Sequence, residues 1–124
     1  MTVSGLILVI FSALLTVAAN LLMRAGILRA GGFHLGLNTI REPILSLLQQ
    51  PMFLIGVILY GAAAVVWFRV LSFENLSNSY PLLVSLTFAL VTLGAALFFH
   101  EQITLQKIVG LLVILVGIIL VASN

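Results

Sequence analysis

The sequence predicts an all-α integral membrane protein in which four transmembrane helices form a bundle. Of its 124 residues, 63% are hydrophobic and only 6% are charged, whereas about a quarter of the residues in a soluble domain carry a charge. The apolar residues form long continuous runs, and a helix needs roughly 20 such residues to cross a bilayer. The strands of a membrane barrel would instead alternate apolar and polar residues. We therefore expect a single membrane domain over residues 1–124, with no separate soluble catalytic domain.

The first apolar run covers about residues 3–23 and ends at Arg24, and Gly31 and Gly32 follow as helix breakers. A secretory signal peptide has a basic segment ahead of a short apolar region. Here no Lys or Arg precedes the run, and the run is long enough to span a bilayer. We therefore expect a retained helix that begins the bundle.

The other three predicted spans cover about residues 51–71, 79–99 and 105–122. The second span begins at Pro51, because proline is favoured at the first position of a helix. In the third span, Pro81 is expected within the first turn, where its missing N–H costs least. Since only a short turn separates the third and fourth spans, these two helices should be antiparallel neighbours.

The connection between the first two spans, about residues 27–50, has apolar residues at helical spacing: Phe33, Leu37, Ile40, Ile44 and Leu48. One interpretation is a helix that lies in the membrane interface, interrupted at Glu42 because Pro43 disfavours a helical residue before it. The other interpretation is an ordered loop that packs on the bundle. The sequence leaves both open.

The few charged residues predict an orientation. Arg24, Arg29 and Arg41 lie in or next to the first connection, and Lys107 follows the third, whereas the opposite side has only Arg69. Because Lys and Arg collect in short cytoplasmic loops, we expect both termini outside.

The same composition excludes several functions. A net charge of +2 is too small for a nucleic-acid surface, so no nucleic-acid partner is expected. The chain has no cysteine, metal-ligand spacing, catalytic triad or phosphate-binding glycine loop. We therefore expect neither an enzyme nor a bound cofactor or metal.

The first span carries the most informative pattern, a polar stripe formed by Ser12, Thr16, Asn20 and Arg24. These residues are spaced by four, which places them on one face of a helix. Polar residues in a span usually face the bundle interior or a cavity, so they are candidates for binding a substrate. The alternative is purely structural, with hydrogen bonds between helices and Arg24 reaching the headgroups.

Further candidates for substrate binding lie on the second and third spans and at the last connection. Aromatic side chains near span ends are also ordinary interface anchors, and this is the favoured interpretation for the tryptophan. These candidates are Tyr60, Trp67, Tyr80, Ser85, Glu101 and Lys107.

The fourth span carries Gly110 and Gly117, seven residues apart on one face. Small residues let another helix approach closely. Because four short helices bury little surface on their own, we expect this stripe to be a dimer contact.

Four segments carry a resemblance to a known family: residues 20–24 (Asn-Leu-Leu-Met-Arg), 79–85 (Ser-Tyr-Pro-Leu-Leu-Val-Ser), 97–101 (Leu-Phe-Phe-His-Glu) and 110–117 (Gly-Leu-Leu-Val-Ile-Leu-Val-Gly). In order and spacing they resemble the drug/metabolite transporter superfamily, in its four-helix branch near the small multidrug resistance proteins. The resemblance covers nearly the whole chain.

Two positions depart from the drug exporters of that branch. Those exporters carry a glutamate eight residues before the basic residue that ends the first helix, and here that position is Thr16. They also carry a Trp three residues after the position of Tyr80, where this chain has Leu83. Both departures disfavour a proton-coupled exporter of cationic drugs.

The Tyr-Pro opening and the His-Glu turn most resemble the flippase subunits for undecaprenyl phosphate–aminoarabinose. The resemblance implies a flippase of a polyprenyl-phosphate lipid or lipid-linked sugar, multi-pass in the bacterial inner membrane and active as a homo- or heterodimer. Under this hypothesis the polar stripe hydrogen-bonds the sugar or phosphate, and basic residues attract the phosphate at the cytoplasmic side.

Two alternatives remain at this point. The first is an exporter of small cationic or amine compounds, with Glu74 or Glu101 as the coupling acid. The second is a membrane adaptor that transports nothing and stabilises a glycosyltransferase or a larger partner.

Overall fold

The computed structural model describes residues 2–33 and 40–123, and within them every regular element is a helix. The helices are α1 (Val3–Arg29), α2 (Arg41–Leu48), α3 (Pro51–Leu71), α4 (Leu76–Phe98) and α5 (Leu105–Ala122). By length and composition α1, α3 and α4 are each able to cross a membrane, and α5 is a shorter apolar helix. The protein is therefore an all-α membrane protein.

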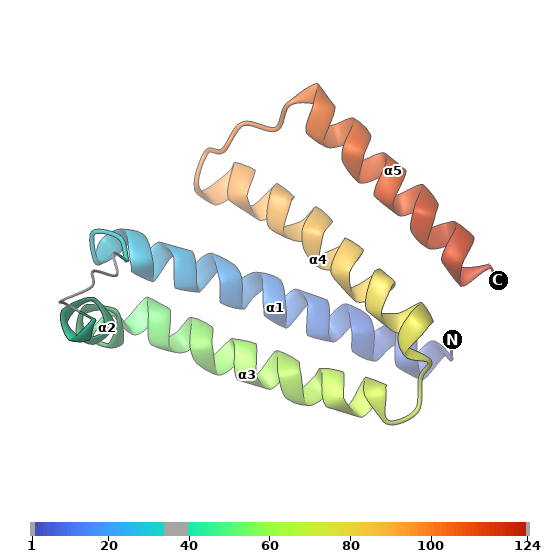
Figure 1. The fold of residues 1–124 in the computed structure, drawn as a ribbon, viewed down its shortest axis with the longest axis horizontal. Helices are drawn as coiled ribbons and strands as arrows, with labels where there is room; N and C mark the ends of the chain where they lie inside the picture. Colours follow the sequence, from blue (N-terminus) through green and yellow to red (C-terminus); the bar gives the residue numbers. More distant parts are fainter. Residues whose placement is uncertain (1, 34–39, 124) are drawn as a thin grey trace.

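Helix α1 lies at the centre of the molecule, with α3 and α4 packed on opposite sides of it (Figure 1). It contains most of the buried apolar side chains, including Val9, Ala13 and Val17. Helix α2 packs at the start of α3, and α5 packs on the outer side of α4. Helices α3 and α4 pack more closely on α1 than on each other, and the three helices enclose a space between them.

Small residues bring α1 and α3 close together. A Cβ atom built on Gly56 would lie 2.8 Å from the carbonyl oxygen of Ala19, and one on Gly26 would lie 2.7 Å from the backbone nitrogen of Phe53. Backbone atoms cannot move aside as a flexible side chain does. In a membrane, helices associate through such close packing because lipid supplies no hydrophobic driving force.

The first helix continues past Arg24, where the sequence predicted its end, and stops only at Arg29. Its end is set by Gly31 and Gly32, which adopt φ values of 86° and 97°. The N–H of Gly32 donates to the carbonyl of Ile27 at 2.9 Å, and that of Gly31 donates to Leu28 at 3.2 Å. These two bonds form a Schellman motif, so the glycines terminate the helix and the charge of Arg24 does not.

The long connection is partly helical, and its helix begins where a break was predicted. Arg41, Glu42 and Pro43 form the first turn of α2. Proline is tolerated there because the first helical N–H groups have no partner within the helix. Leu47 is buried, and α2 packs on α3. Part of the connection, including Leu37, lies outside the described residues.

Helix α4 begins earlier than predicted, at Leu76, with Asn75 as its N-cap residue. Pro81 therefore lies in the second turn and not in the first. The carbonyl of Ser77 consequently receives no bond from residue 81, since proline has no N–H. The predicted span began at residue 79, whereas Leu76, Ser77 and Asn78 are already helical.

Helix α5 has the predicted bounds and is the most exposed element. Its least exposed described residues are Leu111 and Ile118, seven apart, and among the described helices it packs mainly on α4. A Cβ atom on Gly110 or Gly117 would meet nothing within 4 Å. The glycine stripe thus makes no close contact with the described part of this chain, and the dimer contact stays a prediction.

Candidate functional site

A cavity of about 680 Å³ lies between α1, α3 and α4, partly open at its side. Its polar lining comes mainly from the predicted stripe of α1, and its apolar lining comes from α3 and α4. The lining residues named in the sequence analysis are Ser12, Thr16, Asn20, Arg24, Tyr60, Trp67, Tyr80 and Leu83.

The hydroxyl and amide groups of the stripe donate hydrogen bonds to backbone carbonyls. Ser12 Oγ reaches across to the carbonyl of Ala63 on α3 at 3.0 Å. Thr16 Oγ1 donates to the carbonyl of Ser12 at 2.8 Å, and Asn20 Nδ2 donates to that of Thr16 at 2.9 Å. An interhelical bond of the first kind contributes roughly 0.6 kcal/mol in a membrane protein.

This arrangement leaves acceptors for a ligand. The amide group of Asn20 that faces a carbonyl must be its NH₂, which leaves Oδ1 free of that bond. The two hydroxyl oxygens likewise retain lone pairs after donating their protons. The stripe can therefore accept hydrogen bonds from hydroxyl or amino groups and still keep the bonds that it donates to backbone carbonyls.

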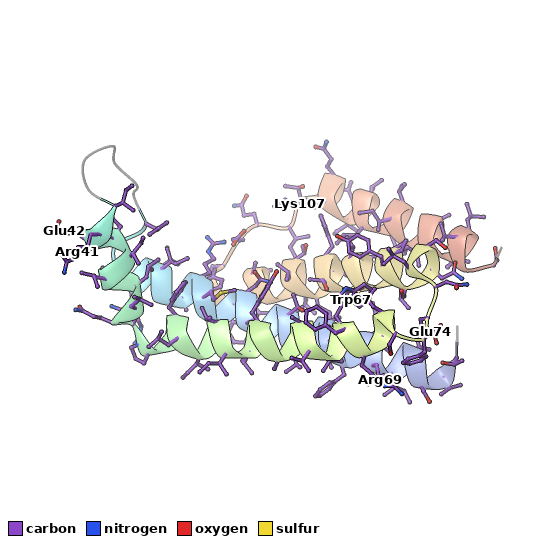
Figure 2. All side chains as sticks on the ribbon, turned by 60° about the horizontal axis from the view of Figure 1, so that its bottom comes forward. Arg41, Glu42, Trp67, Arg69, Glu74 and Lys107 are labelled. Atoms are coloured by element: carbon purple, nitrogen blue, oxygen red, sulfur yellow. The ribbon has the colours of Figure 1, made fainter. Side chains whose placement is uncertain are left out.

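An aromatic pair brings α3 and α4 together at one end of the cavity. The ring centroids of Trp67 and Tyr80 are 6.0 Å apart, with the rings tilted by 53°. Figure 2 shows Trp67 between the two helices, toward the end that carries Arg69 and Glu74. Interface anchoring was the favoured interpretation for Trp67. The structure shows that this residue also lines the cavity.

The opposite end of the cavity carries a cation. The Cζ atom of Arg24 lies 4.9 Å from the centroid of the Phe99 ring, within the range of a cation–π interaction. The guanidinium also forms an ion pair with Glu101, which lies just after α4. Arg24 thus connects α1 to the end of α4.

Three predicted site residues do not line the cavity. Ser85 is buried and donates to the carbonyl of Leu82 at 3.1 Å. Lys107 is exposed at the start of α5, with Nζ 3.5 Å from the carbonyl of Gln102. Glu101 reaches the site only through its ion pair with Arg24.

The sequence analysis missed Thr87 and Phe99, which both line the cavity. Thr87 Oγ1 is buried and has no hydrogen-bond partner among the described residues. A signal existed for this residue, since Thr87 follows Tyr80 by seven and therefore lies on the same face of α4. Nothing in the sequence marked Phe99, because an apolar residue at a helix end is ordinary.

Glu74 lies away from the cavity and fastens the N-terminal end of α1 to the α3–α4 turn. Its carboxylate accepts from the hydroxyl of Thr2 at 2.5 Å and from the N–H of Thr2 at 3.1 Å. The side-chain bond from Thr2 holds the pKa of Glu74 below its usual value. A carboxyl group kept ionised in this way is poorly suited to carry a proton near neutral pH.

Among the described residues, no three His, Asp or Glu side chains lie close enough together to hold a metal ion. The apolar helices and the lined cavity define the class: a small multi-pass helical membrane protein with a polar site between its helices. No protein-family model and no solved structure matches the chain.

Curated relatives give the family. The chain is 31% identical over 119 residues to the probable 4-amino-4-deoxy-L-arabinose-phosphoundecaprenol flippase subunit ArnE of Erwinia tasmaniensis, covering 96% of this chain and 97% of that protein. It is 42% identical over 69 residues to the ArnE protein of an Enterobacter species, covering 56% of this chain and 64% of that relative. A match to the Yersinia pestis ArnE protein has 41% identity and covers 59% of it. The chain belongs to the family of ArnE flippase subunits.

Proposed function

We propose that this protein is a subunit of a flippase that moves a polyprenyl-phosphate-linked sugar across the bacterial inner membrane. The observation that carries the proposal is the polar stripe of α1, which lies along a cavity between apolar helices. A charged headgroup is costly to move through hydrocarbon, so its path must offer polar contacts while the lipid tail stays in the bilayer. The names of the relatives support the same cargo.

The chemistry of the cavity matches the two parts of such a headgroup. The oxygens of Thr16 and Asn20 accept from sugar hydroxyl or amino groups, while the Thr16 hydroxyl proton and one Asn20 N–H stay bonded to backbone carbonyls. Arg24, at the end of the cavity, suits the phosphate, since guanidinium and phosphate form short charge-assisted bonds. We assign sugar contacts to the stripe and the phosphate contact to Arg24.

The aromatic lining suits the remaining surface of a sugar. Tyr60, Trp67 and Tyr80 come from two different helices and face the same cavity. Aromatic rings offer an apolar face together with a polar edge, which fits a ring that carries both C–H and hydroxyl groups. These three residues would hold the sugar ring against the stripe.

The proposal includes a second subunit and a fourth span. After Lys107 the residues of helix α5 are apolar, and its Gly110 and Gly117 face is open for another helix. We propose that α5 crosses the membrane beside α4 and meets a second copy or a related subunit there. Alternating access would then come from rocking the two subunits about the cavity.

The test is transbilayer movement of a fluorescent undecaprenyl-phosphate aminoarabinose in liposomes that contain this protein, alone and together with a related subunit. We expect movement that Asn20→Ala and Arg24→Ala each reduce by about tenfold or more, the factor for a lost hydrogen bond to a charged or buried group. Parental rates in both variants, with normal insertion, would remove the stripe from the path. No movement in either assembly would refute the function.

A further inference from the structure

The guanidinium of Arg24 is already occupied in this structure. Its Cζ atom lies over the ring of Phe99, 4.9 Å from the ring centroid. The carboxylate of Glu101 approaches the Nη1 group from the edge. A ligand anion that binds Arg24 must also approach at the edge, because the N–H groups of a guanidinium point outward in its plane.

The chain places Glu101 there through a specific turn. After α4 ends, His100 adopts a φ of 55°, a left-handed conformation that is uncommon outside glycine. The N–H of Glu101 then donates to the carbonyl of Ala95 at 3.3 Å. This bond turns the linker back along the helix end, so that a carboxylate 77 residues away in sequence reaches Arg24.

We propose that Glu101 is an internal competitor for the anionic headgroup: a polyprenyl phosphate binds Arg24 by replacing the Glu101 carboxylate. This inference rests on the proposed function and adds a residue that lowers affinity for the cargo. Carboxylate and phosphate use the same guanidinium edge. Two anions at one edge repel each other, so binding of the phosphate weakens the contact with Glu101.

The surroundings of Arg24 favour a lipid phosphate over a free phosphate ion. Leu21, Val91 and Ala95 line the same cavity as Arg24 and offer only hydrocarbon. A phosphate that carries an apolar chain gains by burying that chain beside them. Inorganic phosphate has no such gain and would leave its hydration shell for a single cation.

Replacing the Glu101 carboxylate by a phosphate at Arg24 also changes which contacts hold the linker between α4 and α5. Residues 99–104 connect α4 to α5, and α5 packs mainly on α4. The ion pair with Arg24 ties this linker to α1. When phosphate takes the place of Glu101, that tie is released, so cargo binding is coupled to the position of the linker.

The test measures binding of undecaprenyl phosphate to the full chain by native mass spectrometry from lipid nanodiscs. Both partners of the ion pair are partly exposed, at 50% and 37% of the side-chain surface, so the pair is of modest strength. We expect Glu101→Gln to bind the lipid about two- to fivefold tighter. Arg24→Gln should bind it about tenfold or more weaker.

Three controls test whether the change in affinity is specific to Glu101 and Arg24. Glu42→Gln removes one negative charge from α2, at the end of α1 nearest Arg24, and should leave the affinity unchanged (Figure 2). The double variant Arg24→Gln/Glu101→Gln should bind as weakly as Arg24→Gln, because Glu101 acts through Arg24. Inorganic phosphate at the same concentrations should displace none of the lipid.

Each departure from this pattern overturns the inference. Competition at Arg24 would be refuted if Glu101→Gln did not raise the affinity for the lipid. It would also be refuted if Glu42→Gln raised the affinity equally, or if the gain in affinity persisted when Arg24 was also replaced. Displacement by inorganic phosphate would assign the site to a free ion. Transport of the sugar-linked lipid is a separate measurement, so its failure with the binding pattern intact would refute the function and leave the competition standing.

Discussion

At the scale of single residues, position relative to the cavity distinguishes side chains that look alike. Thr16 and Thr92 both donate to the carbonyl four residues earlier at 2.8 Å. Thr16 lines the cavity and Thr92 does not. Their intrahelical bonds are equivalent, so a difference between them in function must come from the cavity.

This pair gives the first prediction. Thr16→Val should lower the rate of lipid-sugar transport by about two- to tenfold, because one hydrogen-bond acceptor is lost from the path. Thr92→Val should keep the parental rate. Both should change the unfolding temperature by similar small amounts, measured by thermal unfolding in detergent. Equal transport by the two variants would show that Thr16 is structural.

A second prediction concerns pH and the contact between Thr2 and Glu74. The bond from Thr2 lowers the pKa of Glu74 in the folded state. The contact therefore stabilises fully above the ordinary glutamate pKa, and its contribution is lost as the pH falls through the lowered value. Thr2→Val should raise the pKa of Glu74 and remove this part of the acid dependence. NMR titration of the labelled Glu74 carboxyl checks the direction, and an unchanged pKa would contradict it.

At the scale of elements, the close crossing of α1 and α3 depends on Gly56, which has no side chain. Gly56→Ala would place its Cβ 2.8 Å from the carbonyl oxygen of Ala19, so the helices must move apart. We expect a loss of about 1–3 kcal/mol, as for other overpacked contacts.

Gly61→Ala is the matched control for this third prediction. Gly61 lies in the same helix, and its added Cβ would meet nothing within 4 Å. This variant should be neutral or slightly stabilising, since alanine favours a helix over glycine by up to about 1 kcal/mol. Steric-trap or denaturant unfolding in micelles measures both, and equal effects would show that the two helices do not cross closely at Gly56.

At the scale of the whole molecule, the helices place the basic residues that predict the orientation at different ends of the molecule. Helix α2, which begins at Arg41, and the Arg24 end of α1 lie at one end of the molecule, and Arg69 and the C terminus lie at the other (Figures 1 and 2). This separation of charge fits the predicted orientation, with both termini outside.

Because the chain has no cysteine, single cysteines can test that fourth prediction. Ser72→Cys and Ser123→Cys should react with a membrane-impermeant maleimide from outside intact spheroplasts. Lys107→Cys should react only after the membrane is permeabilised. The reverse pattern would mean that the termini face the cytoplasm, and labelling of all three sites would mean that the chain inserts in both directions.

The sequence alone determined the class of protein, the helical content and the polar stripe, because these depend on composition and on the period of one helix. Spacing by four placed Ser12, Thr16, Asn20 and Arg24 on one face whatever they packed against. The limits of α3 and α5 were likewise readable, since a proline begins one and polar residues bound the other. Helix ends that depend on backbone hydrogen bonds could not be read from the sequence. The end of α1 at Gly31 and the start of α4 before Pro81 are the two examples.

Only the tertiary structure decided which residues share the cavity. Thr87 lines the cavity and Ser85 does not, because the packing of α4 on α1 fixes which face of α4 turns inward. The pairing of Arg24 with Glu101 joins groups 77 residues apart. No local pattern encodes such a contact, because it depends on how three helices pack and on a turn held by one backbone hydrogen bond.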